Sequence, residues 1–501
     1  MDILNTAART FFGVPYLFPY QRLVISNLLE AATSAGFFQG ASGRSEFNEK
    51  DESEETDEDR KTWGKQIVIL PTGAGKSLCF QLPAMLFEGA TLVIYPILSL
   101  MADQERRLRE RGFEPAVLRG GQSPEERTLL WEKIRSGKSR FIIANPEVLL
   151  TQLETLKTLP IVHAVIDEAH CVGEWGESFR PSYLEIAKIL DASRAPLVTA
   201  FTATASAPTL EKIETYIFGG ERVHRIIGNP DRSNIKYRTR GCILRDLAVR
   251  DLLLKRTGPA IVFCSSRIGT EKLAKYLRNE LKDKNIKFYH AGLERDEKTA
   301  VEQWFFRRSD GVLVATCAYG MGVDKADIRM VIHRDCPPSV EAYLQESGRA
   351  GRDGLPSEAV LLYGPDDANR QNHAKTESDR TRLAKLLDYA NTSRACRRTA
   401  LLKLLDYDAG SAIPSVDPKS CCDVCDGTAK SELREEASLL AFFKKNPRRY
   451  TVLEGAQILA QIEAFRWSQD DAKTAVLQLI RNGKLRRIKN ILWKDKLVIQ
   501  K

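Results

Sequence analysis

The stretch Gln66-Ile-Val-Ile-Leu-Pro-Thr-Gly-Ala-Gly-Lys-Ser77 decides the fold of this 501-residue chain. Residues 67–70 predict a buried strand that Pro71 ends, and residues 78–87 predict a helix after the glycines. A strand, a glycine-rich turn and a helix N-terminus form a phosphate cradle, because backbone N–H groups point inward there. Lys76 would reach the β and γ phosphates, and the Ser77 hydroxyl would ligate Mg²⁺. The predicted phosphate-binding residues are Thr72, Gly73, Ala74, Gly75, Lys76 and Ser77. An ordinary glycine turn between a strand and a helix is the competing interpretation.

The charge distribution indicates a polyanionic partner. The net charge is +9, but residues 46–59 hold nine acids and one lysine, so the remainder of the chain carries +17. Such a basic excess is typical of proteins that bind polyanions. The acidic insert, about residues 44–61, is poor in apolar residues and is predicted to be a disordered surface loop.

The cysteines and the hydropathy predict a protein of a reducing compartment. Six of the ten cysteines lie singly in or beside apolar runs and are interpreted as small core residues: Cys79, Cys171, Cys242, Cys264, Cys317 and Cys336. No apolar run approaches the ~20 residues that span a bilayer, and residues 1–5 lack the basic start of a signal peptide. We expect no secretion and no membrane partner, with a cytoplasmic location in a bacterium or a nuclear one in a eukaryote.

Two adjacent carboxylates follow a second buried strand. Residues 161–166 are apolar, and Asp167 and Glu168 come directly after them. Ligands bind at the carboxyl ends of strands in open α/β sheets. There Asp167 can hold Mg²⁺ through its water shell, while Glu168 polarises the water that attacks the γ-phosphate. A helix N-cap is the alternative role. Because residues 66–205 alternate strand and helix five times, they predict a doubly wound parallel sheet.

A second strand–helix alternation follows a polar, hinge-like linker at residues 229–234. Its strands are predicted near residues 260–264, 287–290, 311–316 and 330–333. After them come Gln345, Arg349 and Arg352, with glycines interleaved. The two arginines lie near one another if this stretch is helical, and they suit a site that neutralises a transferring phosphate. Since this half lacks a phosphate loop of its own, we expect its arginines to complete the first site across a cleft, which ATP binding would close.

These features resemble the RecQ-type DNA helicases of superfamily two, from about residue 12 to residue 425. The phosphate loop has the helicase form Pro-Thr-Gly-Ala-Gly-Lys-Ser, and Asp167-Glu-Ala-His170 matches the family's box. More specific is the aromatic-rich loop at residues 171–183. The resemblance implies that Trp175, Phe179 and Arg180 bind single-stranded DNA there, through stacking and a cation. The family usually has Gln and His at the positions that Glu174 and Glu177 occupy. Trp175 as a core residue is the alternative.

The resemblance also assigns the nucleotide-binding residues. It implies that Gln21 reads the adenine edge, while Leu17 and Phe18 replace the family's usual Phe-Arg pair and remove one basic contact. Arg352 is implied to be the arginine finger. The expected catalytic residues are Lys76, Asp167, Glu168, Gln345, Arg349 and Arg352, and Gly322 and Asp324 join the cofactor-binding set.

Four cysteines near the C-terminal third predict a structural zinc site. They are Cys396, Cys421, Cys422 and Cys425, a set of thiolates that suits a closed tetrahedral centre. Cys422 and Cys425 have the usual knuckle spacing, whereas the adjacent pair Cys421-Cys422 is unusual, because neighbouring residues seldom aim at one ion. Redox-active or merely buried cysteines are the alternative.

The last seventy residues predict a winged helix, with three helices followed by two strands about a turn near Asn490. Residues 481–501 carry eight basic residues and one acid, so Arg486, Arg487 and Lys489 are expected to bind duplex or branched DNA. A solvated basic terminus is the alternative.

The sequence thus predicts an α/β protein with two RecA-like lobes, residues 1–228 and 229–364, a zinc-binding helical subdomain, 365–428, and a winged helix, 429–501. The expected function is an ATP- and Mg²⁺-dependent DNA helicase with 3′→5′ polarity implied by the resemblance. A DNA-binding or annealing scaffold with an idle ATPase and an RNA helicase are the two alternatives.

Overall fold

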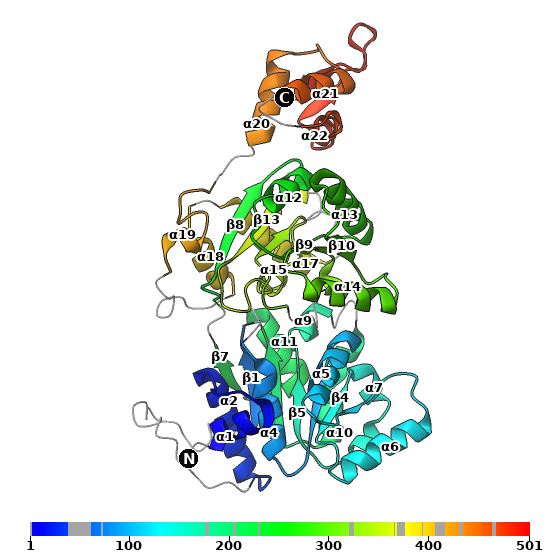
Figure 1. Ribbon diagram of the computed structural model, residues 1–501, viewed down its shortest axis with the longest axis vertical. Coiled ribbons are helices and arrows are strands. Elements are labelled where there is room, and N and C mark those ends of the chain that lie inside the picture. The colour runs from blue at the N-terminus through cyan, green and yellow to red at the C-terminus, as the bar shows by residue number, and fades with distance from the viewer. Residues whose placement is uncertain are drawn as a thin grey trace. The chain divides into compact units, whose positions relative to one another are not determined.

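The structure is a computed structural model, and its described residues form two compact units. Those up to Asp231 belong to the first unit and those from Arg232 onward to the second (Figure 1). The described ranges are 3–38, 62–71, 74–175, 180–203, 207–228, 231–319, 325–364, 366–367, 376–392, 394–405, 416–429, 434–462 and 467–500. The predicted acidic insert lies outside them, and the finer division into four domains stays a prediction.

The first unit is built on a seven-stranded sheet in which every pair is parallel, as predicted. The strand order is β3-β4-β2-β5-β6-β1-β7. The strands are β1 (Lys65–Ile69), β2 (Ala90–Ile94), β3 (Ala116–Val117), β4 (Phe141–Ala144), β5 (Ile161–Ile166), β6 (Leu197–Thr202) and β7 (His224–Ile227). The helices are α1 (Ile3–Phe12), α2 (Pro19–Ser34), α4 (Lys76–Leu86), α5 (Leu98–Glu110), α6 (Pro124–Arg135), α7 (Pro146–Leu150), α8 (Leu153–Leu156), α9 (Cys171–Trp175), α10 (Ile186–Ser193) and α11 (Ala207–Phe218).

Both faces of this sheet are buried, which explains why its strands read as continuous apolar runs. Ile67 and Ile69 pack into one core cluster, whereas Val68, between them, packs into another. Successive strand residues point to opposite faces, so each face needs its own apolar cover. Because the strands are parallel, their carboxyl ends, and the polar residues that follow them, lie at one edge of the sheet.

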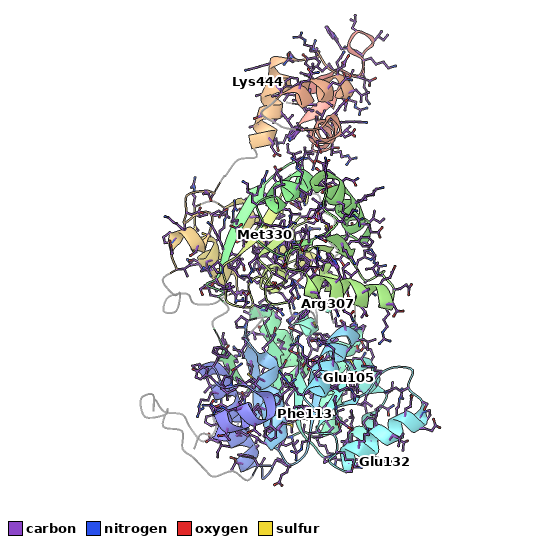
Figure 2. The ribbon with its side chains drawn as sticks, in the orientation of Figure 1. Glu105, Phe113, Glu132, Arg307, Met330 and Lys444 are labelled. Atoms are coloured by element: carbon purple, nitrogen blue, oxygen red, sulfur yellow. The ribbon has the colours of Figure 1, made fainter. Side chains whose placement is uncertain are left out.

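The second unit contains a six-stranded parallel sheet with the order β10-β11-β9-β12-β13-β8. Met330, labelled in Figure 2, is a buried residue of this sheet. The strands are β8 (Ile235–Gly241), β9 (Ala260–Phe263), β10 (Ile286–Tyr289), β11 (Val312–Ala315), β12 (Met330–His333) and β13 (Ser357–Tyr363). The accompanying helices are α12 (Arg245–Leu253), α13 (Arg267–Leu281), α14 (Arg295–Arg307) and α15 (Val340–Ser347).

Helices α17 (Glu377–Asn391), α18 (Arg397–Leu404) and α19 (Pro418–Cys421) follow the second sheet. After them come α20 (Arg434–Lys445), α21 (Val452–Gln461) and α22 (Gln469–Arg481), and an antiparallel pair, β14 (Leu485–Arg487) with β15 (Leu497–Ile499). These last elements share a core that includes Phe443, Leu459 and Val476, and Ile243 and Leu247 of the second lobe join it. Ser468 caps α22 as predicted.

One of the cysteine predictions is wrong. Cys79, Cys171, Cys242, Cys264 and Cys336 are buried as expected, but Cys317 is exposed. It lies in a short 3-10 helix (Cys317–Tyr319) just after β11, so the apolar run that suggested burial has already ended. Within the described part of the chain, no helix has the length and apolar character needed to cross a membrane.

Candidate functional site

The predicted phosphate loop leads into helix α4, which begins at Lys76. Gly75 precedes it with φ +73°, a left-handed conformation that glycine adopts without strain. A Cβ on Gly75 would lie 2.6 Å from Gln21 Nε2, so a side chain there would displace the Gln21 amide. The helix N-terminus leaves backbone N–H groups for an anion. Ala74, Lys76 and Ser77 belong to this junction, while Thr72 and Gly73 lie outside the described residues.

Strand β5 brings both predicted carboxylates to the N-terminal end of α4. Lys76 Nζ lies 3.5 Å from Glu168 Oε1, and both side chains are only about one-tenth exposed. Asp167 is buried, and its Oδ1 accepts a 3.0 Å hydrogen bond from the Glu168 backbone N–H. Glu168 has φ +52°, a strained backbone conformation for a non-glycine residue. The turn after β5 therefore directs the Glu168 side chain toward the N-terminal end of α4.

The electrostatics of the carboxylate pair suit a cation. Burial, and then the negative charge of Glu168, raise the pKa of Asp167 to about 6. Two buried carboxylates in one place are unfavourable unless positive charge accompanies them. Oxygen ligands of this kind, with the Ser77 hydroxyl, are what Mg²⁺ prefers, so the residues fit that ion.

His170 supports the same turn, and the sequence interpretation gave it no role. Its Nδ1 lies 3.4 Å from Glu168 Oε2 and 3.1 Å from Thr202 Oγ1, at the end of β6. The sequence could have indicated this role. His170 comes two residues after Glu168, and Thr202 ends the next predicted strand, so both side chains are expected at the same edge of a parallel sheet.

Gln21, the predicted adenine reader, is buried beside the phosphate loop. Its Nε2 donates to Ala74 O at 3.0 Å, and its Oε1 accepts from the Phe18 N–H at 2.9 Å. Tyr20, which belongs to the same predicted adenine-recognition motif but had no role of its own in the sequence analysis, also reaches the loop, because its hydroxyl donates to Ala74 O at 3.2 Å. Phe18 stacks on Tyr20 with ring centroids 5.5 Å apart. Recognition of adenine by Gln21 stays a prediction.

The buried His163 of β5 gives the first lobe a pH-dependent stability. Its Nε2 lies 2.9 Å from Thr199 Oγ1, and burial lowers its pKa from 6.5 to about 3. Between these pH values His163 is protonated in the unfolded chain but neutral in the folded chain, so the free energy of unfolding falls as the pH falls from 6.5 toward 3. At pH 5 the loss is about 2 kcal/mol.

His163→Asn, which keeps a hydrogen-bonding group, is expected to shrink the difference in unfolding free energy between pH 7 and pH 5 by that amount. Urea denaturation at both pH values measures it, and an equal loss in both proteins would contradict it.

The arginines of the second lobe lie on a turn, so the helix on which the sequence analysis made their proximity depend does not extend to them. Helix α15 carries Gln345 but ends at Ser347, so Arg349 and Arg352 follow it. Gly351 has a left-handed φ of +54°, so the chain does not continue as a right-handed helix here. A Cβ there would lie 2.5 Å from Asn234 Nδ2 and 2.6 Å from Leu355 O, which favours glycine. Arg349 is buried and Arg352 is half-buried. Gly322 and Asp324 lie outside the described residues.

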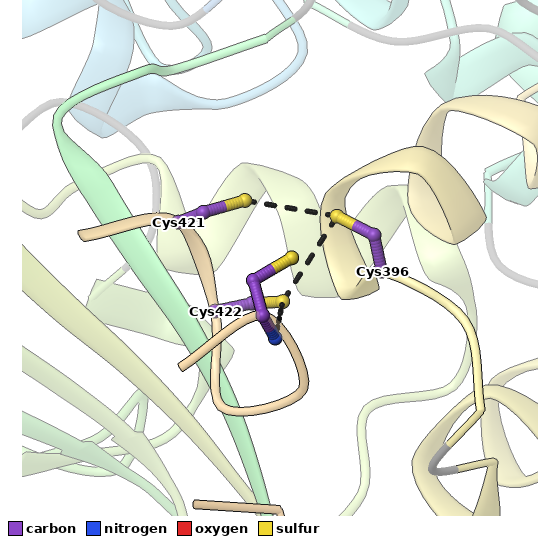
Figure 3. A group of neighbouring side chains, drawn as sticks. Cys396, Cys421 and Cys422 are labelled. Carbon is purple, nitrogen blue, oxygen red and sulfur yellow. Dashed lines mark hydrogen bonds between the residues drawn. The ribbon is translucent and has the colours of Figure 1, made fainter. Parts of the chain in front are cut away.

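The four predicted metal cysteines come together, and Figure 3 labels three of them, Cys396, Cys421 and Cys422. Their sulfur atoms all lie within 4.8 Å of one another, and Cys396 Sγ is 3.6 Å from Cys421 Sγ and 3.9 Å from Cys422 Sγ. A tetrahedral zinc site with Zn–S bonds of about 2.3 Å places its sulfurs roughly 3.8 Å apart. The hydrogen bond from Cys422 lowers the pKa of the Cys396 thiol to about 3. The donor set and its spacing therefore fit a zinc ion, which would supply folding energy.

The sheet edge holds this cysteine cluster in place. Cys422 pairs with Tyr237 of the edge strand β8, and Asp423 Oδ2 accepts from the Thr239 N–H at 3.0 Å. Asp423 also forms a buried ion pair with Arg397, with Oδ1 2.9 Å from Nε. Because Cys396 is the N-cap of α18 and Arg397 is its first residue, the cluster joins that helix to the second sheet.

Comparisons with known proteins agree with this geometry. The DEAD/DEAH box helicase model matches residues 57–213, and the helicase conserved C-terminal domain model matches residues 244–354. The ATP-dependent DNA helicase RecQ of Bacillus subtilis (strain 168) is 32% identical over 414 residues, which cover 78% of this chain and 67% of that relative. The chain belongs to the RecQ family.

Other relatives carry the same family name. The ATP-dependent DNA helicase RecQ of Haemophilus influenzae is 33% identical over 413 residues, covering 80% of this chain and 65% of the relative. That of Pasteurella multocida is 35% identical over 370 residues, covering 72% and 57%. The chain thus spans about three fifths of the length of these two relatives.

Solved structures show the same fold at low identity. Mss116p bound to single-stranded RNA and AMP-PNP has a TM-score of 0.56 and 16% identity, covering 96% of this chain and 89% of that one. The DUF1998 helicase MrfA bound to DNA has a TM-score of 0.55 and 19% identity, covering 78% and 57%. These likenesses confirm the two RecA-like parallel-sheet lobes.

The aromatic loop of this RecQ chain is described only at its ends. Helix α9 ends at Trp175, whose side chain lies outside the described residues, as does all of Phe179. Arg180 is anchored, because its guanidinium donates to the Pro96 carbonyl and its Nε lies 3.6 Å from Glu147 Oε1. Pro96 follows β2, so Arg180 ties the loop to the carboxyl edge of the first sheet. Its contact with DNA stays a prediction.

The C-terminal hairpin carries exposed basic residues, and the preceding segment adds more. Arg486, Arg487 and Lys489 are exposed, and their binding of DNA stays a prediction. Sequence reasoning missed Arg448 and Arg449, which are also exposed. Their segment pairs with β15: the Arg448 N–H donates to Leu497 O at 3.0 Å, and the Leu497 N–H donates to Tyr450 O at 2.8 Å. Lys444, labelled in Figure 2, lies near the end of α20. The Arg448-Arg449 pair was visible in the sequence, but its place beside the hairpin was not.

Proposed function

We propose that this RecQ-family chain is an ATP- and Mg²⁺-dependent DNA helicase that moves 3′→5′ along single-stranded DNA and unwinds duplex or branched DNA in repair and recombination. The observation that carries the proposal is the approach of Lys76 Nζ to 3.5 Å from Glu168 Oε1, at the N-terminus of α4 and the end of β5. Lys76, which would bind phosphate, the Glu168 carboxylate and the N-terminus of α4 meet there, as hydrolysis of a nucleoside triphosphate requires.

Each residue of the site has a distinct task. Lys76 and the N–H groups that begin α4 bind and orient the β and γ phosphates. Glu168 accepts the proton of the attacking water, and His170 keeps the Glu168 carboxylate in place through the 3.4 Å contact. Ser77 and Asp167 would hold Mg²⁺, which supplies neutralisation of the phosphate charge. Arg349 and Arg352 would stabilise the charge that develops on the transferring phosphate.

The cysteine cluster and the C-terminal elements complete the proposal. Zinc held by Cys396, Cys421, Cys422 and Cys425 would fix α18 against β8. Helices α20, α21 and α22 with the β14–β15 pair would act as a winged helix that binds the duplex backbone. Trp175, Phe179 and Arg180 would contact the single strand.

Substitution of the hairpin arginines tests the proposed duplex contact. Each phosphate contact that is lost should lower the slope of log K against log salt by about 1. Arg486→Gln with Arg487→Gln is therefore expected to weaken binding to a duplex of any sequence and to lower the slope by about 2. Salt titrations followed by fluorescence anisotropy measure this. The matched control is Lys157→Gln with Lys188→Gln, exposed lysines of the first lobe that should leave the slope unchanged. An unchanged slope in the arginine variant would show that the hairpin is only a solvated basic terminus.

The function as a whole is tested by ATP hydrolysis with single-stranded DNA, single-stranded RNA or no polymer. We expect strong stimulation by DNA and unwinding of a duplex with a 3′ single-stranded tail. Equal stimulation by RNA would favour the RNA helicase instead. DNA binding without any stimulation would favour a scaffold whose ATPase is idle.

A further inference from the structure

The turn that carries Arg349 and Arg352 is bound by an arginine from the start of the second unit. Arg232 Nη1 donates to Gly348 O at 3.1 Å, and its Nη2 donates to Ala350 O at 3.2 Å and to Gly351 O at 2.8 Å. One planar guanidinium thus holds the carbonyl groups on both sides of Arg349. Such hydrogen bonds from a charged donor are stronger than neutral ones.

A neighbouring side chain fixes the other end of the turn. Asn234 Nδ2 donates to Gly351 O at 2.8 Å and to Leu355 O at 2.9 Å. The Gly351 N–H donates to Ile328 O, and the Ser357 N–H donates to Asn234 O. The sequence predicts a polar linker for the segment that contains Arg232 and Asn234. In the structure this segment forms hydrogen bonds with the arginine turn from Gly348 to Leu355.

Helix α18, whose N-cap is Cys396, holds this segment through Arg398. The buried Arg398 donates from Nη1 to Arg232 O at 2.9 Å and from Nη2 to Ile235 O at 2.8 Å. Its guanidinium also lies over the Tyr237 ring, 5.5 Å from the centroid. A continuous set of contacts thus runs from the cysteine cluster through Arg398 and Arg232 to the arginine turn, within one unit.

We propose that Arg232 is a positioning residue for ATP hydrolysis, and that Arg398 of α18 keeps Arg232 in place. This rests on the proposed function, in which Arg349 and Arg352 act on the transferring phosphate. A displacement of about 1 Å in a group that acts only in the transition state can lower a rate about a hundredfold, while it leaves ground-state binding nearly untouched. In this proposal Arg232 acts through the turn that it binds and not on the nucleotide. Its contribution belongs in kcat and not in KM.

The test replaces Arg232 by lysine in the full chain. Lysine keeps the charge and the stem, but its compact ammonium cannot bridge three carbonyls with the planar geometry of a guanidinium. We expect the DNA-stimulated kcat to fall about 10- to 100-fold, with KM for ATP, affinity for a fluorescent ATP analogue and Tm close to those of the wild type. Arg398→Lys is expected to give a smaller fall of the same kind. The matched control is Arg238→Gln, on the same strand as Tyr237, which removes an ion pair with Glu358 at 3.2 Å and should keep the wild-type rate.

The outcomes separate this inference from the function on which it rests. If the wild type hydrolyses ATP and Arg232→Lys matches its kcat, the positioning role is wrong and the helicase proposal stands. If Arg232→Lys loses nucleotide affinity and thermal stability together with kcat, the residue is merely structural and the inference is also wrong. A wild type that does not hydrolyse ATP with any DNA overturns both.

Discussion

Replacement of Glu168 by glutamine is expected to abolish DNA-stimulated ATP hydrolysis while nucleotide binding persists. Glutamine keeps the size and the hydrogen-bonding reach of the side chain, but it cannot accept the proton of the attacking water. Loss of a general base lowers kcat by about 10²- to 10⁴-fold. Because Lys76, Ser77 and the start of α4 are untouched, the phosphates should still bind, and the affinity for ATP should change by only a few-fold.

The surroundings of Glu168 allow this effect to be separated from indirect ones. The Glu168 charge raises the pKa of Asp167, so its removal lets Asp167 ionise more readily, and lost activity cannot be ascribed to a protonated Asp167. Glu154→Gln is the matched control, since Glu154 is an exposed acid of the same lobe whose ion pair is on the surface. Steady-state hydrolysis with single-stranded DNA and titration with a fluorescent ATP analogue measure both quantities. A Glu168→Gln chain that hydrolyses ATP at the wild-type rate would remove Glu168 from the mechanism.

Local sequence rules predicted the two halves of the nucleotide site separately. An apolar run, Pro71 and two glycines define the junction of β1 and α4, and the strand before Asp167 defines the carboxylate edge. The sheet order places β6 between β1 and β5, and that order follows from no local pattern. The 3.5 Å approach of Lys76 to Glu168, 92 positions apart, therefore required the structure. The same holds for His170, whose partner Thr202 is on another strand.

The failed and missing predictions have equally local causes. A helix through Arg349 and Arg352 conflicts with Gly351, whose left-handed backbone closes a turn. The segment around Arg232 has the polar composition of a hinge. The sequence gives no sign that Arg232 forms hydrogen bonds with a turn 116 to 119 positions away. The doubt over Cys421 and Cys422 was geometric, and the backbone removes it. Cys421 ends helix α19, whereas Cys422 is extended with φ −163° and ψ 171°, so the chain changes direction between them.

Substitution of Cys422 by serine is expected to remove zinc and to destabilise the second unit. Cys422 is fully buried, and its sulfur accepts N–H groups from Arg397 and Cys425, each at 3.4 Å. Structural zinc binds with apparent free energies of about 10–16 kcal/mol in small domains, and hydroxyl oxygen is a poor replacement for a thiolate. The zinc content should fall from about one ion per chain to a small fraction of that, and Tm should fall by roughly 5–10 °C.

The effect should spread beyond the metal, because the same loop completes the edge of the second sheet. Without zinc, the backbone pairing of Cys422 with Tyr237 should weaken. The buried ion pair between Asp423 and Arg397 then loses the neighbouring structure that holds its two side chains together. Leaving either charge unpaired would cost about 3–5 kcal/mol, so the segment should open as a whole. Cys317→Ser, at an exposed cysteine outside the cluster, is the matched control and should keep both zinc and Tm. Elemental analysis and thermal melts of the two variants decide the matter. If Cys422→Ser kept a full equivalent of zinc and the wild-type Tm, Cys422 would not be a zinc ligand. If the wild-type chain itself held no zinc, the four cysteines would be a thiol cluster and no metal site.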